Sequence, residues 1–292
     1  MDDSPLVEAI EPEAAFSVLA DGSRLDILHA LYEADGQTAT FSELRDAVGM
    51  GDSGKFNYHL GKLRGRFVRK TNDEYELRSA GRNVVGALLS GAYTMAGSID
   101  PLVLEDPCPA CAGELTFDYA DERVHIECAA CPFQSTFPVP PGAFADHPVE
   151  RFPSVADRYV RTLLTQSRSG FCSQCYGHVE PTLRPFDELG WLDSYPDFGD
   201  VVAVVYDCDR CRNSTQINLA TFMLDHPEVG AFHHERNVDV RDVPIWQMGA
   251  VDGEPQSAMI DDASGVAKVT YAVDGDRLTL TVDERLDVVG VE

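Results

Sequence analysis

The eight cysteines of this 292-residue chain form four Cys-x-x-Cys pairs, and such pairs supply the thiolate ligands of structural zinc sites. The first set, with 16 residues between its pairs, consists of Cys108, Cys111, Cys128 and Cys131. The second set, with 32 residues between its pairs, consists of Cys172, Cys175, Cys208 and Cys211. The first spacing is typical of a zinc ribbon, in which a hairpin joins two thiolate-bearing turns.

We predict one structural zinc ion at each set, because four thiolates complete a tetrahedron and leave no open position for a reacting water molecule. Such an ion would contribute directly to folding, since a small ribbon has little apolar core. His178 could replace a ligand of the second set, although its four cysteines already suffice. Two alternatives stay open, namely a redox-active dithiol pair and cysteines that bind nothing.

Strands and turns that would position the cysteines are visible in the hydrophobic pattern. Strands are predicted over residues 114–119, 123–127 and 201–206, and the proline-containing insert 176–200 is predicted to be a loop. An amphipathic helix over 154–166, capped by Ser154, would link the two ribbons, and a second helix is predicted over 216–226. Alternation around Asp274-Gly275 predicts a small antiparallel sheet from residues 257–260, 265–273 and 277–282.

The amino-acid composition indicates the kind of environment in which the protein works. The net charge is -26, from 30 Asp and 19 Glu against 19 Arg and four Lys. So acidic a surface with so little lysine indicates a halophilic protein, because high salt screens the self-repulsion. The alternative is a protein from an ordinary environment that binds cations or basic partners.

The expected compartment follows from the chain start and the cysteines. The first ten residues are acidic and lack the basic start and apolar core of a secretory signal. No run of about 18 apolar residues is present, so no membrane span is expected. We therefore expect a cytoplasmic protein, in which cysteines are better explained as metal ligands than as disulfides.

The stretch from Ser53 to Lys70 carries six basic residues and no acidic one. Asp52 or Ser53 can cap a helix there. Four apolar residues recur at helical spacing and predict a buried stripe, namely Phe56, Leu60, Leu63 and Phe67. The opposite face would be cationic and rich in hydrogen-bonding groups, which is the form of a recognition helix in a DNA major groove.

Flanking segments complete a small domain. Two short helices are predicted over 11–34, a third begins at Phe41, and residues 67–71 and 74–78 form a hairpin. Three helices and a ribbon indicate a winged helix-turn-helix. The segments FSVLADGSRLDILHALYEAD, FSELRDAV, SGKFNYHLGKLRGRFVRK and NDEYELRSAG resemble the ArsR-type winged-helix transcriptional regulators of archaea over residues 8–98, one third of the chain.

The resemblance implies roles for the residues of this segment. Base edges would be read by Ser53, Lys55, Asn57 and Tyr58, and phosphates would be contacted by Lys62, Arg64, Arg66, Arg69 and Lys70. His59 is expected to pack inward. The apolar stretch 80–99 is predicted to be a helix that pairs two protomers, or alternatively one that packs against the rest of its own chain. Residues 1–107 contain no cysteine, which removes the simplest metal-sensing mechanism of that family from this domain.

The expected fold class is α+β, with a winged helix-turn-helix followed by two zinc-ribbon-like modules, a linking helix and a small antiparallel sheet. We predict domains over 1–100, 101–150 and 151–292. The first carries most of the cationic character, since residues 1–99 hold 10 basic and 15 acidic residues, whereas residues 100–292 hold 13 and 34. We therefore expect the acidic C-terminal part to be repelled by DNA.

The expected function is a dimeric regulator that binds double-stranded DNA and carries a zinc-bearing sensor or assembly module, with an unknown effector. One alternative is a thiol-redox-responsive regulator, and another is a zinc-ribbon protein-interaction module. An enzyme is not expected, because no phosphate loop, nucleophile elbow or open metal site is visible.

Overall fold

The computed structural model describes residues 11–189, 201–247, 250–251, 254–261 and 265–292. The chain divides into two compact units, Met1–Met95 and Ala96–Glu292. The boundary lies just before the predicted residue 100, and the regions predicted as two domains, 101–150 and 151–292, belong to one unit. No helix in the described part of the chain is long and apolar enough to cross a membrane.

The first unit surrounds its core with short helices and a small sheet. Its helices are α1 (Pro12–Leu19), α2 (Gly22–Glu33), α3 (Phe41–Ala47), α4 (Ser53–Leu63) and α5 (Ser79–Leu89), with a 3-10 turn at Asp35–Gln37. Its antiparallel strands, in the order β1-β3-β2, are β1 (Thr38–Thr40), β2 (Val68–Thr71) and β3 (Glu74–Leu77). The predicted hairpin is present within one residue at each end. Strand β1 was not predicted, and its buried Ala39 pairs with Tyr75 of β3.

The predicted apolar stripe is buried as a group. Phe56, Leu60, Leu63 and Phe67 are all 4% exposed or less, and they pack with side chains of α2 and of the small sheet. Helix α4 begins at the predicted place, because the Oδ1 atom of Asp52 accepts hydrogen bonds from the backbone N–H groups of Gly54 and Lys55 at 2.8 and 3.0 Å. These bonds hold the pKa of Asp52 below its usual value.

The helix predicted over 80–99 is shorter than expected. Helix α5 ends at Leu89, the N–H of Ser90 closes its last turn on Gly86, and Gly91 follows with a φ of +73°. Glycine adopts this left-handed conformation without steric cost, so the helix stops there despite the apolar residues beyond it. Ile99 already belongs to strand β4 (Ile99–Val103) of the second unit, and Asp100-Pro101 lies inside that strand at a shift of register.

The second unit begins with an antiparallel sheet in the order β4-β5-β6-β7, which holds the first cysteine set. The further strands are β5 (Leu115–Ala120), β6 (Arg123–Cys128) and β7 (Gln134–Pro138). Asp121 and Glu122 form the predicted β5–β6 turn with φ values of 51° and 60°. Successive positive φ values are the signature of a two-residue hairpin turn that matches the twist of the flanking strands.

The second cysteine set lies on an antiparallel sheet in the order β10-β9-β8. Its strands are β8 (Pro181–Pro185), β9 (Val202–Asp207) and β10 (Ser214–Asn218). Strand β9 confirms the predicted strand. Strand β8 corrects the prediction of a loop over 176–200, of which residues 190–200 lie outside the described part. The helix predicted over 216–226 is also corrected, because β10 continues to Asn218, whose side chain then caps α7 (Leu219–Phe222).

The remaining elements cover the two ribbons. They are α6 (Phe152–Arg168), α8 (Pro227–His234), several 3-10 turns (Pro141–Ala143, Val149–Arg151, Phe186–Leu189, Met223–Asp225 and Ile245–Gln247), the pair β11 (Ala250–Val251) and β12 (Glu254–Pro255), and a sheet of β13 (Ser257–Asp261), β14 (Val266–Val273), β15 (Asp276–Val282) and β16 (Val288–Val291). The predicted C-terminal sheet is present, with β16 as an additional edge strand.

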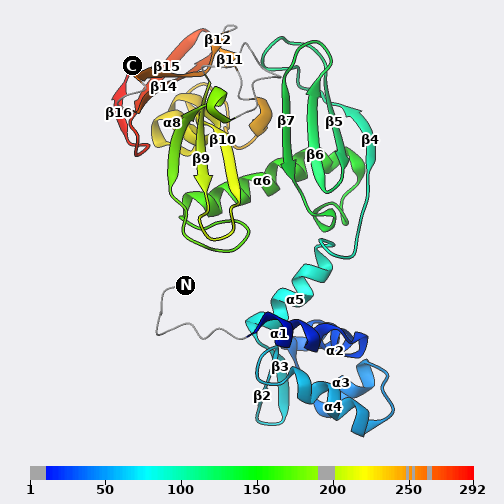
Figure 1. Cartoon of the computed structure of the whole chain (residues 1–292). Coiled ribbons are helices and arrows are strands. Elements are labelled where there is room, and N and C mark those ends of the chain that lie inside the picture. Colours follow the sequence, from blue (N-terminus) through cyan, green and yellow to red (C-terminus); the bar gives the residue numbers. More distant parts are fainter. Residues whose placement is uncertain (1–10, 190–200, 248–249, 252–253, 262–264) are drawn as a thin grey trace. The chain divides into compact units, whose positions relative to one another are not determined.

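Helix α6 joins the two cysteine-bearing sheets, as predicted. Its N-terminal half packs Val155, Ala156 and Val160 into the core of the first sheet, and Leu164 reaches the core of the second (Figure 1). The helix begins at Phe152 rather than at 154. Ser154 is therefore not its cap, and its hydroxyl donates to the carbonyl of Arg151 instead.

Candidate functional site

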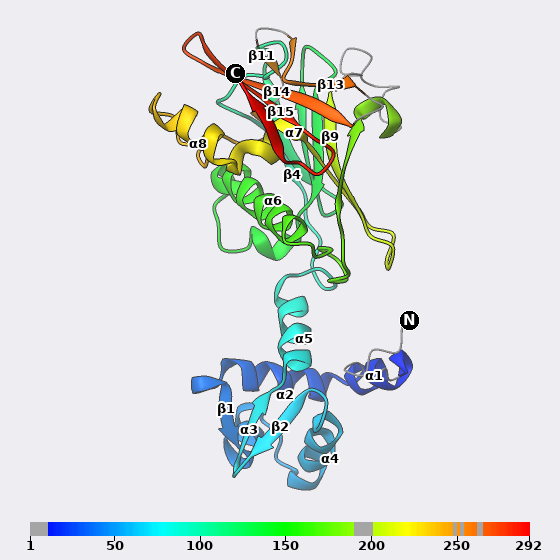
Figure 2. The same cartoon turned by 90° about the vertical axis from the view of Figure 1, so that its left-hand side faces the viewer.

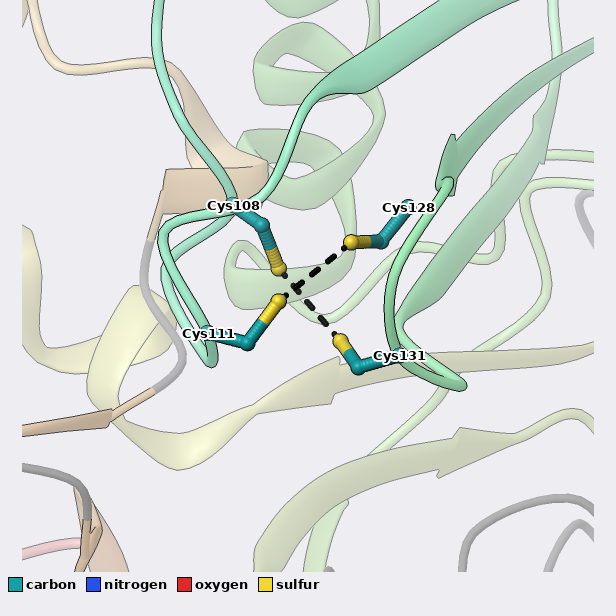
Figure 3. A group of neighbouring side chains, drawn as sticks. All are labelled: Cys108, Cys111, Cys128 and Cys131. Atoms are coloured by element: carbon teal, nitrogen blue, oxygen red, sulfur yellow. Dashed lines mark hydrogen bonds between the residues drawn. The ribbon is translucent and has the colours of Figure 1, made fainter.

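The first cysteine cluster is built by two loops of the β4–β7 sheet. Cys108 and Cys111 come from the loop before β5, Cys128 is the last residue of β6, and Cys131 lies in the turn that follows it (Figure 3). The four sulfurs converge, with the Sγ atoms of Cys108 and Cys131 3.7 Å apart and those of Cys111 and Cys128 3.5 Å apart. All four lie within 4.8 Å of one another.

The second cluster repeats this arrangement. The Sγ atoms of Cys172 and Cys211 are 3.7 Å apart, those of Cys175 and Cys208 are 3.5 Å apart, and all four again lie within 4.8 Å of one another. His178 lies outside this group and is 3.8 Å from the carboxylate of Glu180. The second cluster therefore offers four cysteine sulfurs, and the substitution by histidine that the sequence allowed is not needed.

The loops of the two clusters also have the same pattern of backbone hydrogen bonds. The N–H of Cys108 donates to the carbonyl of Gly113, and the N–H of Cys172 donates to that of Gly177, both at 2.8 Å. In each chain segment the order is loop, strand, strand, loop, strand, so that β5-β6-β7 corresponds to β8-β9-β10. The second unit thus contains two copies of one structural plan.

The sulfur positions fit a tetrahedral metal ion. A tetrahedral ion with metal–sulfur distances of about 2.3 Å has sulfur–sulfur edges of about 3.8 Å, close to the 3.5 and 3.7 Å separations. A disulfide would require about 2.05 Å, and all eight cysteines are free. Each described cluster is therefore able to hold a metal ion through four sulfur atoms.

Two glycines make room for the sulfurs, and they were not singled out from the sequence. A Cβ atom on Gly113 would lie 3.2 Å from the sulfurs of both Cys111 and Cys128, and one on Gly177 would lie 3.2 and 3.3 Å from those of Cys175 and Cys208. A signal for them exists, because both first pairs of a set continue as Cys-x-x-Cys-x-Gly.

The thiols of a cluster differ in proton affinity. Burial raises the pKa of Cys131 to about 12, and hydrogen bonds with the neighbouring sulfurs act in the same direction. Burial also raises the pKa of Cys128, but hydrogen bonds from the Ala130 N–H and the Cys111 thiol outweigh it and leave the value at about 7. In the second cluster, the N–H of Cys211 lowers the pKa of Cys208 to about 7. Each site therefore presents one thiol that ionises near neutral pH.

The residues predicted to contact DNA lie on the surface of the first unit. Every one of them is exposed: Ser53, Lys55, Asn57, Tyr58, Lys62, Arg64, Arg66, Arg69 and Lys70. We call this surface the cationic face. Tyr58 is 55% exposed, and the ammonium of Lys62 lies over its ring at 5.4 Å from the centroid. Both views place α4 and the tip of the β2–β3 hairpin at the end of the first unit opposite the C-terminal end of α5 (Figures 1 and 2).

Two of the predicted phosphate contacts are engaged elsewhere. The guanidinium of Arg69 donates to the carboxylate of Glu76 across the hairpin at 2.7 Å, and this pair lowers the pKa of Glu76. The ammonium of Lys70 lies 3.8 Å from the carboxylate of Asp73. The hairpin therefore offers less free positive charge than the sequence alone indicates.

His59 packs inward, as expected from the sequence. It is 5% exposed, and its Nδ1 atom lies 3.6 Å from the carboxylate of Asp21, which caps helix α2. The ring of Tyr58 contacts it edge-on at 5.3 Å between centroids. His59 thus helps to fix α4 against α2, below the exposed face.

Comparisons with known proteins divide the chain as the fold does. The family described as "Domain of unknown function (DUF7351)" matches residues 105–288, and the family described as "Domain of unknown function (DUF7347)" matches residues 12–88. The two matched regions fall one in each compact unit. No curated protein and no solved structure matches the chain.

Proposed function

The chain belongs to the DUF7351 family, whose matched region holds both cysteine clusters, and we propose that this member is a sequence-specific transcriptional regulator that binds double-stranded DNA. The first unit would act as an ArsR-like winged helix-turn-helix, with α4 as its recognition helix and β2–β3 as its wing. The second unit would carry two structural zinc ions as a sensor or assembly module.

The cationic face, which extends from α4 to β2, carries this proposal. In a chain with 49 acidic and 23 basic residues, six basic residues without an acid would be an improbable chance cluster between Ser53 and Lys70. Phe56, Leu60 and Leu63 hold the back of the helix in the core, so its front is free for a partner. A helix presenting cations and amides in this way suits the major groove, where base edges offer hydrogen-bond acceptors and donors.

The ion pairs of the hairpin favour α4 as the element that would discriminate between DNA sequences. Arg69 and Lys70 already have carboxylate partners, so moving them to phosphates brings little net gain in charge pairing. High salt would weaken the contribution of phosphate contacts further, because the release of counterions from DNA contributes less to binding when the salt concentration is high. Asn57 is exposed and would form a bidentate pair with adenine, which discriminates by about 1–3 kcal/mol.

The test compares Asn57→Ala with Lys70→Ala. A binding site is first selected from random duplex DNA, and affinities are then measured by fluorescence anisotropy in high salt. We expect Asn57→Ala to weaken binding by about 5- to 150-fold, corresponding to that pair, and Lys70→Ala to weaken it only slightly. Equal losses for both variants, or a selection that enriches no sequence, would contradict the proposal.

Dimer formation is part of the proposal. Leu89, Tyr93 and Met95, at and after the end of α5, are 46%, 83% and 46% exposed. Large exposed apolar side chains are common on surfaces that pair two protomers. Light scattering should report a dimer, and Tyr93→Glu should shift it to a monomer with weaker operator binding. A wild-type monomer at micromolar concentration would exclude this arrangement.

A thiol-redox response is a second candidate function, and it is favoured because one cysteine in each cluster is exposed. Cys111 and Cys211 are exposed, and each sulfur has another cysteine sulfur within 3.7 Å. Two-electron oxidation by a peroxide, which is itself reduced to water, would join two neighbouring thiolates of one cluster as a disulfide and release the bound ion. Metal content by mass spectrometry before and after peroxide treatment tests this, and an unchanged content would exclude it.

A further inference from the structure

Gly61 is an exposed glycine inside the proposed recognition helix α4. Glycine in a helix interior is unfavourable relative to alanine, because it loses more conformational freedom on folding. A Cβ atom added at Gly61 would meet nothing within 4 Å, so no contact in the described part of the chain excludes a side chain there. The first unit should therefore accept alanine at this position and gain helix stability from it.

Two other helical glycines of the first unit have a reason within the chain. A Cβ atom on Gly54 would lie 3.2 Å from the Oδ1 atom of Asp52, which caps α4. A Cβ atom on Gly81 would collide with the backbone carbonyl oxygen of Phe67, which cannot move away as a flexible side chain can. No such contact exists at Gly61, so packing within the first unit does not explain the missing side chain.

The place of Gly61 on α4 gives the missing side chain a consequence. Gly61 lies two residues before the buried Leu63 and hence about 160° away from it around the helix axis, on the exposed side. A helical side chain leans toward the N-terminus and covers the turn that precedes it. A side chain at position 61 would therefore cover the backbone beside Tyr58 and Asn57, three and four residues earlier, which are both exposed.

The charges around this bare backbone fit the major groove of DNA. Lys55 and Lys62 are exposed on α4, the helix itself contains no acidic residue, and the exposed Arg64 and Arg66 follow it. The floor of the major groove lies about 8.5 Å below its rim, and the side chain of Asn57 is short. The helix must therefore enter deeply before this amide reaches a base edge, and a glycine allows its backbone to approach closely.

We propose that Gly61 sets the depth at which α4 enters the major groove of double-stranded DNA. The edge of a base pair packs against the bare backbone at Gly61, and this contact brings Asn57 within hydrogen-bonding distance of an adenine on the groove floor. Gly61 is thus a positioning residue, because it acts through Asn57. The inference rests on the proposed function and adds to it the residue that determines how closely helix and bases approach.

The Gly61→Ala substitution should change stability and DNA affinity in opposite directions. Hydrogen exchange at the amides of α4, followed by mass spectrometry on the full-length, zinc-loaded chain, should slow by up to about fivefold, because alanine favours the helix. Binding to the selected duplex, measured by fluorescence anisotropy, should weaken by about 5- to 150-fold, because a methyl group inserted into a packed contact is costly. Gly61→Leu should weaken binding further, since the obstruction grows with the side chain.

Gly230→Ala, in helix α8 of the second unit, is the matched control. A Cβ atom there also meets nothing within 4 Å, so this variant makes the same change inside another helix. It should leave DNA affinity unchanged.

A double-mutant cycle tests whether Gly61 acts through Asn57. Asn57→Ala should weaken binding by about 5- to 150-fold in the otherwise wild-type chain. In the Gly61→Ala chain the same change should cost about twofold or less, because the displaced helix no longer brings the amide to its base. Lys70→Ala, on the hairpin, should have the same slight effect in both chains.

Two results would overturn the inference and leave the proposed function intact. One is a wild-type chain that binds its selected sequence while Gly61→Ala and Gly61→Leu bind it equally well. The other is an undiminished cost of Asn57→Ala in the Gly61→Ala chain. Weaker binding together with faster exchange at α4 would also overturn it, because the affinity would then be lost through unfolding of the helix. A wild-type chain that selects no sequence would overturn the proposed function and the inference together.

Discussion

A methyl group added at Gly113 should weaken metal binding at the first cluster. Its Cβ would lie 2.9 Å from the Cβ of Ala130 and 3.2 Å from the sulfurs of Cys111 and Cys128. The first distance is shorter than real Cβ contacts, and Ala130 has no flexible side chain that could move away. The strain must therefore shift the two loops that bring the sulfurs together.

The magnitude follows from the cost of overpacking. Inserting one carbon into a packed region costs about 1–3 kcal/mol, which corresponds to about a 5- to 150-fold loss of zinc affinity if the metal-bound arrangement bears the strain. Gly177→Ala should cost less, because its nearest contacts, with two sulfurs and the Cβ atom of Arg210, lie at 3.2 to 3.4 Å and none is as short as 2.9 Å. Gly230→Ala is the matched control, since a Cβ there meets nothing within 4 Å.

Competition with a chromophoric chelator measures the two affinities, and ¹¹³Cd NMR shows which cluster is affected. The expected order of loss is Gly113→Ala, then Gly177→Ala, then Gly230→Ala with none. A Gly113→Ala protein with two sites of wild-type affinity would refute the reasoning. It would mean that the loops bend to admit a methyl group and that the glycine has no role in placing the sulfurs.

The remaining predictions concern the core of the first unit and the protons of the clusters. Phe56→Ala should destabilise the first unit by about 3–5 kcal/mol in chemical denaturation, because Phe56 is 0% exposed, whereas Tyr58→Ala, on the exposed side of the same helix, should cost less than about 1 kcal/mol. Equal costs would contradict the placement of the apolar stripe. Zinc affinity should fall as the pH falls, since binding displaces protons from thiols. Between pH 7 and 9 binding displaces the proton of Cys131, with a pKa of about 12, and that of Cys108, whose pKa burial raises, so the loss is at least about tenfold per pH unit. Below the pKa of about 7 of Cys128 a further proton makes it steeper. Competition titrations between pH 6 and 9 check this, and a pH-independent affinity would contradict thiolate ligation.

Local patterns were sufficient for the two features that carry the proposed chemistry. The Cys-x-x-Cys spacing encodes a turn that brings two sulfurs together, and the residues between the pairs encode the hairpin that brings the pairs together. The stripe of Phe56, Leu60 and Leu63 likewise encodes which side of α4 is buried. Each of these depends on neighbours within a few turns or one hairpin, so the sequence contains the needed information.

Pairing with distant partners was not visible in the sequence. The three residues of β1 become a strand because β3, more than 30 residues later, offers them an edge. Strand β8 begins and ends with proline, which argues against a strand except at an edge, and β8 is such an edge strand. The segment from Gln216 to Asn218 pairs with β9 before α7 begins, so an apolar spacing that also suits a helix was misassigned.

Helix α6 bears on how the second unit could be divided in the laboratory. A fragment ending at residue 168 would leave Leu164 without the apolar neighbours of the second sheet, and a fragment starting at residue 169 would remove that side chain from their core. Neither half should survive as an isolated domain, even with its own four cysteines intact. The two cysteine clusters are thus inseparable by truncation, and only point substitutions can report on them one at a time.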